Sequence, residues 1–324
     1  MKINRNFPSL KLTIAIPTFN RYEYLKNNIK RILPQISIID CVELLIIDNA
    51  STDNTAKFCK LLSDEGKIKY IRLEENRGMS ESQYHCFKRS KGEYLWILSD
   101  DDYAESYSVE YVLESVNTNL DLYAFNYTSS MDERISPPIG PDKSQQFNFG
   151  YELINHPSVG HMSGLVYKRE LAEKKVDELL KIFPITYFNL TRGIYGTVFA
   201  ALANDSLISS CYKAKPLFCA VEQKSLDYNG LSHLCLLIFT HFRLLKKINI
   251  VEDEIFNFQI KLVRARIIKS FLRWYPTLNE KESLYIDYLL TPFFRNNIFN
   301  KAIFGITKNI FFKKFLLTLY RLKK

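Results

Sequence analysis

The sequence contains a run of three consecutive carboxylates, Asp100, Asp101 and Asp102, which follows the apolar segment 94–98 and Ser99. Hard divalent cations such as Mg²⁺ and Mn²⁺ prefer carboxylate, water and phosphate oxygens as ligands. Magnesium typically takes one or two protein carboxylates and completes its shell with water and substrate phosphates. The run therefore predicts binding of Mn²⁺ or Mg²⁺ together with a phosphate-bearing ligand. A solvated turn that caps the following helix is the alternative interpretation.

Three further polar clusters follow apolar segments earlier in the chain. They contain Pro17, Thr18, Asn20 and Arg21 in the first cluster, Asp48 and Asn49 in the second, and Asn76 and Arg77 in the third. Arg21 and Arg77 can each contact a phosphate, and Thr18 can bind a nucleotide base. Asp48 can accept a hydrogen bond from a base N–H or a ribose hydroxyl. The same residues also suit ordinary turns and helix caps, so single clusters leave the choice open.

The elements that must position these clusters alternate between strand and helix patterns. Strands are expected at 12–17, 42–47, 68–73 and 94–98, and helices at 22–33 (with Pro34 after its end), from Ser51 or Thr52 to 62, at 80–90 and at 108–116. This order predicts an α/β fold with a Rossmann-like, mostly parallel sheet and helices on both faces. Ligands bind such sheets at the carboxyl ends of the strands. Because all four clusters follow strands, they are expected to gather along one edge, which favours a binding site over isolated turns.

The second half of the chain indicates further strands at 121–127 and 163–167, a helix at 169–180, and helical patterns from about residue 226 onward. We therefore expect one α/β domain over residues 1–225 and a helical C-terminal region over 226–324. Within the first domain, residues 10–115 form the half that binds the phosphate-bearing ligand, and residues 116–225 form the half that faces its reaction partner.

Four motifs in this order resemble the signatures of family 2 glycosyltransferases. They are Ile16 to Arg21, Val42 to Thr55, Glu75 to Gly78, and Gly92 to Asp102. The resemblance implies a GT-A fold and inverting transfer of a sugar from a nucleotide-sugar donor with a divalent cation. By the family pattern, Asp48 contacts the nucleotide base and Asp100 lies by the ribose or diphosphate. Asp101 is then the metal ligand, and Asp102 is the alternative candidate for that role.

Several positions depart from the family pattern. Asp48-Asn49-Ala50 stands in place of Asp-Asp-Gly, Ser99 in place of the first Asp of the acidic motif, and Gln83-Tyr84 in place of an Arg-Asn pair. No Glu-Asp pair, which supplies the base in many members, occurs between residues 164 and 224. An inverting displacement needs a base that takes the proton of the acceptor hydroxyl. His161 and Asp205 are the candidates that the sequence offers.

The net charge of +9 is concentrated at the C-terminus, where residues 291–324 hold eight bases and no acids. The rest of the chain is nearly neutral, so a nucleic-acid partner is not expected. Residues 293–324 have amphipathic helical spacing, which suits either an anionic membrane interface or packing on the domain. Six scattered cysteines without a CxxC pair, and a start without an apolar signal segment, predict a cytoplasmic protein. Peripheral contact with the inner face of the membrane is a hypothesis that rests on 293–324.

The acceptor expected from the family and the basic segment is a glycan or lipid-linked chain of a surface polysaccharide, such as lipopolysaccharide or capsule. A nucleotidyltransferase is one alternative. Such an enzyme would need a basic, glycine-rich loop after the first strand, and residues 17–20 contain neither a basic residue nor a glycine. The other alternative is a non-catalytic subunit that binds the donor or acts as a scaffold, which the missing Glu-Asp pair suggests.

Overall fold

The computed structural model describes residues 9–131, 134–147, 153, 161–182, 184–185, 193–203 and 207–221. The chain divides into two compact units, residues 1–223 and 224–324, and every described residue lies in the first unit. The expectations for the helical region 226–324, for its basic segment 293–324 and for Asp205 lie outside the described residues.

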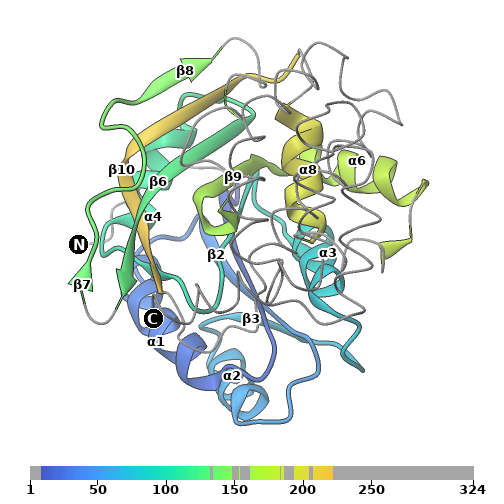
Figure 1. The fold of residues 1–324 in the computed structure, drawn as a ribbon. Helices are drawn as coiled ribbons and strands as arrows, with labels where there is room; N and C mark the ends of the chain where they lie inside the picture. The colour runs from blue at the N-terminus through green and yellow to red at the C-terminus, as the bar shows by residue number, and fades with distance from the viewer. Residues whose placement is uncertain are drawn as a thin grey trace, which may run out of the picture. The chain divides into compact units, whose positions relative to one another are not determined.

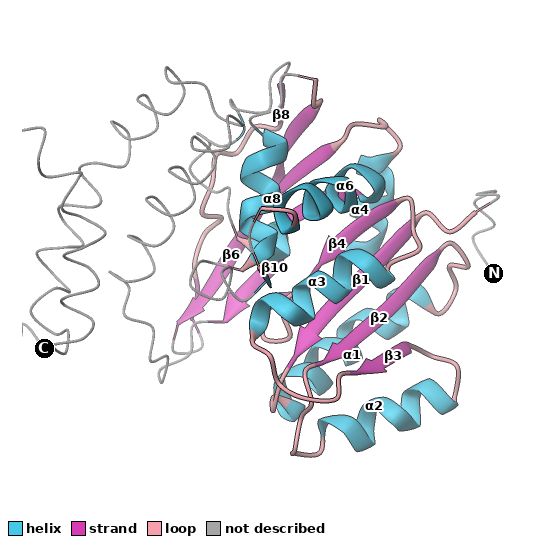
Figure 2. Cartoon of the chain, turned by 90° about the vertical axis from the view of Figure 1, so that its right-hand side faces the viewer, coloured by secondary structure: helices cyan, strands magenta, loops and turns pink. Residues whose placement is uncertain are grey.

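Four parallel strands form the first half of the sheet, in the order β3-β2-β1-β4. Figure 1 labels β2 and β3, and Figure 2 labels all four strands. They are β1 (Leu12–Thr18), β2 (Val42–Asp48), β3 (Lys69–Arg72) and β4 (Tyr94–Ile97). The connecting helices are α1 (Tyr22–Ile36), α2 (Thr55–Asp64) and α3 (Met79–Arg89). The predicted α/β architecture is therefore confirmed. β1 is buried along its whole length, as its nearly continuous apolar run suggests.

The sheet continues from β4 through β9, β6 and β10 to β5. The strands of this second half are β5 (Tyr103–Ala104), β6 (Leu122–Met131), β7 (Arg134–Ile135), β8 (Gln145–Phe147), β9 (Leu165–Lys168) and β10 (Ser210–Val221). The helices between them are α4 (Ser108–Val116), α6 (Arg169–Leu180) and α8 (Ile194–Ala203). A short 3₁₀ turn, η1 (Met162–Gly164), precedes β9. β9 runs antiparallel to both of its neighbours, whereas β10 runs parallel to β6. This half of the sheet is therefore mixed, while the first half is purely parallel.

Helices cover both faces of the sheet. α1 buries Leu25, Ile29 and Ile32 at helical spacing, and α4 contributes Val109, Val112 and others to the same core. α3, α6 and α8 pack against one another, and Figure 2 shows them together on the near face of the sheet. The first four strands are thereby held between two helical layers, which fixes the position of their carboxyl ends.

Two predicted helix boundaries are wrong. α1 continues through Pro34 to Ile36 rather than ending at Leu33. Proline removes one N–H from the last turn, but the side-chain amide of Gln35 bonds to the Glu105 carbonyl (2.9 Å) and to the Val109 N–H (3.0 Å), which anchors that turn on α4. α2 begins at Thr55 rather than after Ser51 or Thr52, because the backbone of both residues is bonded in the loop after β2.

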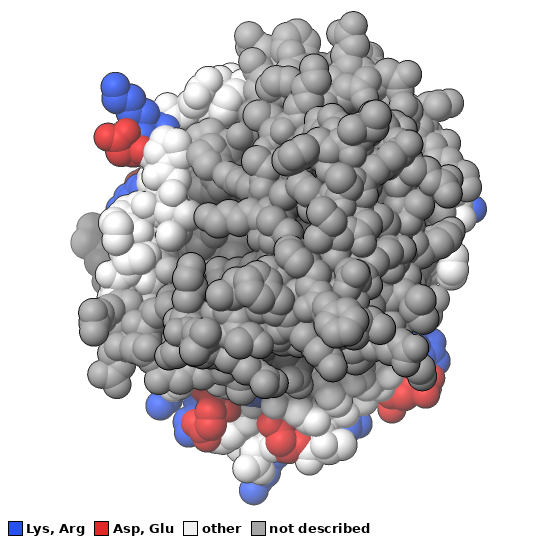
Figure 3. Space-filling view, viewed as in Figure 1, with Lys and Arg blue, Asp and Glu red and all other residues white. Residues whose placement is uncertain are grey.

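No helix in the described ranges is both long and apolar enough to cross a membrane. The five cysteines that the structure describes are buried and form no disulfide with one another. Figure 3 shows lysine and arginine side chains interspersed with aspartate and glutamate along the lower rim of the face in view. Charges of one sign therefore do not gather on the described part of that rim.

Candidate functional site

The structure brings the polar clusters after β1, β2, β3 and β4 together at one edge of the sheet. Thr18, at the end of β1, donates its hydroxyl to Asp100 Oδ2 at 2.7 Å. Asn20 Oδ1 accepts the Thr52 N–H at 2.7 Å, which joins the first cluster to the loop after β2. Asn49 Nδ2 in turn donates to Asn76 Oδ1 at 2.9 Å. Each cluster therefore contacts at least one other, as parallel strand ends allow.

Arg21 and Ser99 hold the middle carboxylate of the acidic run. Arg21 Nη1 donates to Asp101 Oδ2 at 2.6 Å and lies 3.7 Å from Asp100 Oδ1. The Ser99 hydroxyl donates to Asp101 Oδ1. Asp101 is therefore paired through both of its oxygens, and the guanidinium group spans two of the three acids.

The other two carboxylates of the run are buried. Asp100 is 5% exposed and Asp102 is 3% exposed. Burial, and next the charge of Asp101, raises the pKa of Asp100 to about 7 despite the opposing effect of Arg21. The same two causes raise the pKa of Asp102 well above its ordinary value. Ionisation of all three acids beside one guanidinium would leave negative charge uncompensated, which is why, in addition to burial, the pKa values of Asp100 and Asp102 rise. A divalent cation would compensate that charge, so it suits the chemistry of this donor set.

The turn η1, which precedes β9, packs against Asp102. The Ser163 hydroxyl donates to Asp102 Oδ2 and accepts the Ser99 N–H at 2.9 Å, while the Ser163 carbonyl accepts Trp96 Nε1 at 2.7 Å. His161 Nδ1 lies 3.4 Å from the same Asp102 oxygen, and its ring contacts Tyr127 and Phe218. The base candidate His161 therefore lies at the acidic run.

We expect Ser163→Ala to lower the free energy of unfolding by about 2 kcal/mol, because it leaves a buried carboxylate and the Ser99 N–H without their partner. Ser115 is a matched control: it is also buried, and its hydroxyl has no hydrogen-bond partner among the described residues. Ser115→Ala is therefore expected to be neutral or slightly stabilising. Denaturant unfolding of both variants measures the difference. Equal losses would contradict the role given to the Ser163 hydroxyl.

Asp48 is fully buried beneath the loop after β2. Its Oδ1 accepts the Ser51 N–H at 2.8 Å and its Oδ2 accepts the Tyr70 hydroxyl at 2.7 Å. Arg72 Nε lies 3.7 Å from Oδ2, and its Nη2 donates to the Ser51 carbonyl at 3.0 Å. Asp48 thus organises the loop that follows it, and a contact with a nucleotide base remains a proposal.

The remaining candidates have different surroundings. Asn20 and Ala50 adopt left-handed backbone conformations, with φ of 51° and 65°, which turn the chain sharply after β1 and β2. Pro17 pairs in register with Ile47 inside the sheet. Arg77 is exposed, and its Nε bonds to Glu75 at 2.8 Å rather than to the acidic run. The structure therefore does not bring Arg77 to the carboxylates.

Sequence reasoning missed three residues that shape the site, namely Asn28, Tyr70 and Ser163. Asn28 Nδ2 donates to the Ser99 carbonyl at 3.0 Å from the buried face of α1. A signal was present, since Asn28 stands at the apolar helical spacing of Leu25 and Ile29. Tyr70 and Ser163 carry no comparable signal.

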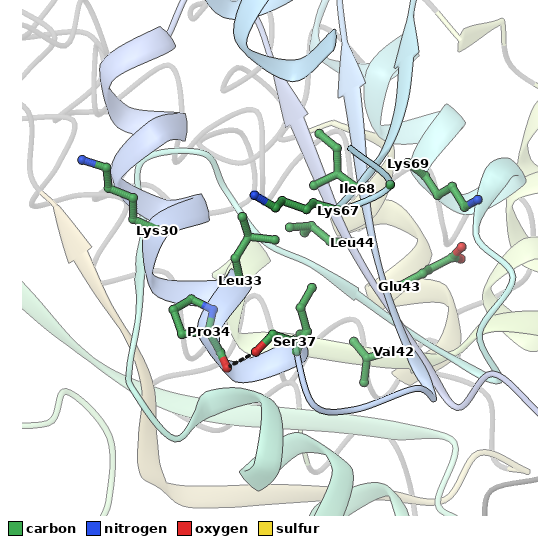
Figure 4. A pocket seen from close by; sticks show the side chains of 12 residues that line it. Lys30, Leu33, Pro34, Ser37, Val42, Glu43, Leu44, Lys67, Ile68 and Lys69 are labelled. Atoms are coloured by element: carbon green, nitrogen blue, oxygen red, sulfur yellow. Dashed lines mark hydrogen bonds between the residues drawn. The ribbon is translucent and has the colours of Figure 1, made fainter. Parts of the chain in front are cut away.

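Within the described residues, no group of three His, Cys, Asp or Glu side chains is arranged to hold a metal ion by itself. A cation held by one or two of the carboxylates in the acidic run would have its shell completed by water and ligand phosphates. A hollow of about 710 Å³ lies at the amino end of β2, lined by residues such as Leu33, Val42, Leu44 and Lys67 (Figure 4). Because it lies at the other end of the strand from Asp48, it forms no part of this site.

Residues 13–174 match the sequence model of the protein family described as glycosyl transferase family 2. The glycosyltransferase GlyG of Streptococcus pneumoniae is 24% identical over 36% of this chain and 38% of its own length. The poly(ribitol-phosphate) β-N-acetylglucosaminyltransferase TarP of Staphylococcus aureus is 31% identical over 31% of each chain. A GalNAc(5)-diNAcBac-PP-undecaprenol β-1,3-glucosyltransferase of Campylobacter jejuni is 30% identical over 33% of this chain and 35% of its own. The matches thus span about a third of the length of each of these three relatives.

Solved structures share the fold at lower identity. Residues 1–349 of TarS from S. aureus superpose with a TM-score of 0.61 at 14% identity, covering 97% of this chain and 92% of that one. The same protein has been solved in complex with UDP-GlcNAc. The mannosyltransferase PcManGT of Pyrobaculum calidifontis, solved with GDP-Man and Mn²⁺, gives 0.54 at 14% identity and covers 95% and 84% of the two chains. The fold is therefore that of GT-A glycosyltransferases.

Proposed function

The chain belongs to glycosyltransferase family 2, and from that premise we propose that it moves a sugar from a nucleotide-diphosphate-sugar donor to a glycan or lipid-linked acceptor. The reaction is inverting and assisted by Mn²⁺ or Mg²⁺. The observation that carries the proposal is the meeting of strand-end clusters at the acidic run, where Thr18 and Arg21 contact Asp100 and Asp101. A donor needs this combination of carboxylates for a cation and a guanidinium for phosphate.

Asp101 and Asp102 are the residues that we assign to the cation, with Asp100 and Ser99 beside the ribose or diphosphate. When bound, the cation supplies Lewis-acid stabilisation of the negative charge that grows on the departing diphosphate. Thr18, Asn20 and Arg21 line the donor side. Asp48 and Asn49 form the floor beneath the base, and Asn76 fixes Asn49 through its side-chain amide.

The base that takes the acceptor proton is assigned to His161 among the described residues. One third of its side chain is exposed, and its Nδ1 lies 3.4 Å from Asp102. A neutral imidazole near the operating pH can accept a proton from a hydroxyl. Asp205 stays a second candidate outside the described residues. A base variant should lose transfer to the acceptor while it still binds the donor.

The acceptor class rests on named relatives and on the sequence. TarP is named for poly(ribitol-phosphate), and the C. jejuni relative for an undecaprenol-linked glycan. We therefore propose a place in the assembly of a surface polysaccharide on the cytoplasmic side of a membrane. Contact of 293–324 with that membrane is part of the proposal. Deleting these residues and fractionating cells tests it, and unchanged membrane recovery would count against the contact.

A thermal-shift screen of nucleoside diphosphates, each with and without Mn²⁺, tests donor binding. At 100 times its Kd, a single-site ligand adds about 2.7 kcal/mol of stability, which raises the melting temperature of a chain of this length by about 4 °C. We expect at least one nucleoside diphosphate to do so only when Mn²⁺ is present. No shift with any base would refute the proposed function.

A non-catalytic donor-binding or scaffolding subunit is the second candidate, favoured by the absence of a Glu-Asp pair between residues 164 and 224. Donor hydrolysis separates the two. The proposed enzyme releases nucleoside diphosphate from its donor slowly without acceptor, whereas a scaffold binds the same donor with Mn²⁺ and leaves it intact.

A further inference from the structure

Arg21 pairs with two carboxylates of the acidic run. Its Nη1 lies 2.6 Å from Asp101 Oδ2 and 3.7 Å from Asp100 Oδ1. The other Asp101 oxygen accepts the Ser99 hydroxyl, and Asp100 Oδ2 accepts the Thr18 hydroxyl. A divalent cation that approaches Asp101 therefore meets the positive charge of the Arg21 guanidinium, which repels the cation and competes with it for the same carboxylates.

The guanidinium group can leave this position at modest cost. Its side chain is 31% exposed, so solvent weakens the ion pair. Arg21 is also the residue from which α1 starts, since its carbonyl accepts the Leu25 N–H at 3.0 Å. Its backbone is thus fixed at the edge of the site while its long side chain can turn. A planar guanidinium that leaves a carboxylate is well suited to bind a phosphate through two parallel hydrogen bonds.

We propose that Arg21 is the resident counter-ion of the acidic run, which a divalent cation displaces and which then binds the donor diphosphate. The inference rests on the proposed function and adds the order in which charges exchange at the site. Before the donor arrives, Arg21 and the cation compete for the same carboxylates. After it arrives, both are used, because the diphosphate brings further negative charge.

The proposal predicts effects of opposite sign for one substitution. Arg21→Ala removes a positive charge next to the carboxylates, so Mn²⁺ binding to the nucleotide-free protein should tighten by about tenfold. The same variant loses a charge-assisted contact with the diphosphate, so nucleoside diphosphate binding in saturating Mn²⁺ should weaken by about tenfold or more. Arg21→Lys keeps the positive charge but lacks the two parallel N–H donors of the guanidinium group. This variant is expected to have a Mn²⁺ affinity near that of the wild type.

Lys26 provides a matched control on the same helix. Its side chain is also 31% exposed, and it pairs with Glu23 at 3.7 Å rather than with the acidic run. Lys26→Ala should change neither affinity. The experiment uses the full chain: electron paramagnetic resonance of free Mn²⁺ gives the metal Kd without nucleotide, and calorimetry gives the Kd of the nucleoside diphosphate found in the thermal-shift screen. Melting temperatures confirm that each variant is folded. If Arg21→Ala does not fold, Arg21→Gln replaces it in the same measurements.

Tighter Mn²⁺ binding together with weaker nucleotide binding in the alanine variant supports the proposal. Weaker or unchanged Mn²⁺ binding overturns it, because Arg21 would then only hold the acidic run in place. A wild-type protein that binds Mn²⁺ but no nucleoside diphosphate refutes the proposed function instead. The two failures are therefore distinguishable.

Discussion

Asp102→Asn is expected to abolish Mn²⁺-dependent nucleotide binding and, at the same time, to raise the melting temperature of the nucleotide-free protein. Asp102 is 3% exposed, and burial raises its pKa well above the ordinary value, so its charged form destabilises the fold. Asparagine keeps the shape and can still accept the Ser163 hydroxyl through Oδ1. It loses the charge that attracts a cation, however.

The two effects can be measured separately. The nucleotide Kd in saturating Mn²⁺ should rise by about 100-fold, at the upper end of what losing a metal-supporting group costs. The melting temperature without ligand should rise by about 1.5 °C, corresponding to about 1 kcal/mol of relieved burial cost. A site that loses function while the fold gains stability is the signature of a carboxylate placed for a ligand.

Asp101→Asn is the informative comparison. Asp101 is more accessible, and it is held by Arg21 and by Ser99. Its substitution should also remove Mn²⁺-dependent binding, because it is the other proposed ligand, but without the gain in melting temperature. If both variants keep full Mn²⁺-dependent binding, the assignment of the cation to this run is wrong.

The arrangement of the first four strands could be predicted from the sequence because each strand carries its own local signal. Val42 to Ile47 and Tyr94 to Leu98 are apolar runs that end in polar residues, and the rules for parallel sheets place such ends on one edge. The meeting of Thr18 with Asp100 follows from those rules without knowledge of any side-chain distance.

The partners of the carboxylates could not be predicted in the same way. Ser163 lies 61 positions from Asp102. The sequence predicts a strand that begins at Ser163, whereas the structure has the turn η1 there and the strand begins at Leu165. The contact of Ser163 with Asp102 depends on β9 pairing antiparallel to β4, which no pattern within either segment specifies. The predicted end of α1 was wrong for a similar reason. The side-chain hydrogen bonds of Gln35 to Glu105 and Val109 outweighed the local preference of Pro34 to end the helix. Pairings between distant segments decide what local patterns leave open.

Asp48→Ala should lower the free energy of unfolding by about 3 kcal/mol, since it leaves the Ser51 N–H and the Tyr70 hydroxyl without their buried acceptor. Tyr70→Phe removes one donor and keeps the carboxylate, so its cost should be about 1 kcal/mol. Denaturant unfolding of the nucleotide-free protein measures both values.

Nucleotide binding by Asp48→Ala and Tyr70→Phe then tests whether Asp48 contacts the nucleotide base. If Asp48 contacts the base as well as the loop, Asp48→Ala weakens nucleoside diphosphate binding by about tenfold or more, because a hydrogen bond to a charged group is lost. Binding is measured under conditions in which the variant is folded. Tyr70→Phe should bind nucleotide like the wild type, because the Tyr70 hydroxyl bonds to Asp48 Oδ2 and is assigned no contact with the nucleotide. Equal losses of binding in both variants would mean that Asp48 acts only by shaping that loop. A loss confined to Asp48→Ala is the result that we expect, because a carboxylate that already orders the loop after β2 is also held in place for a base above it.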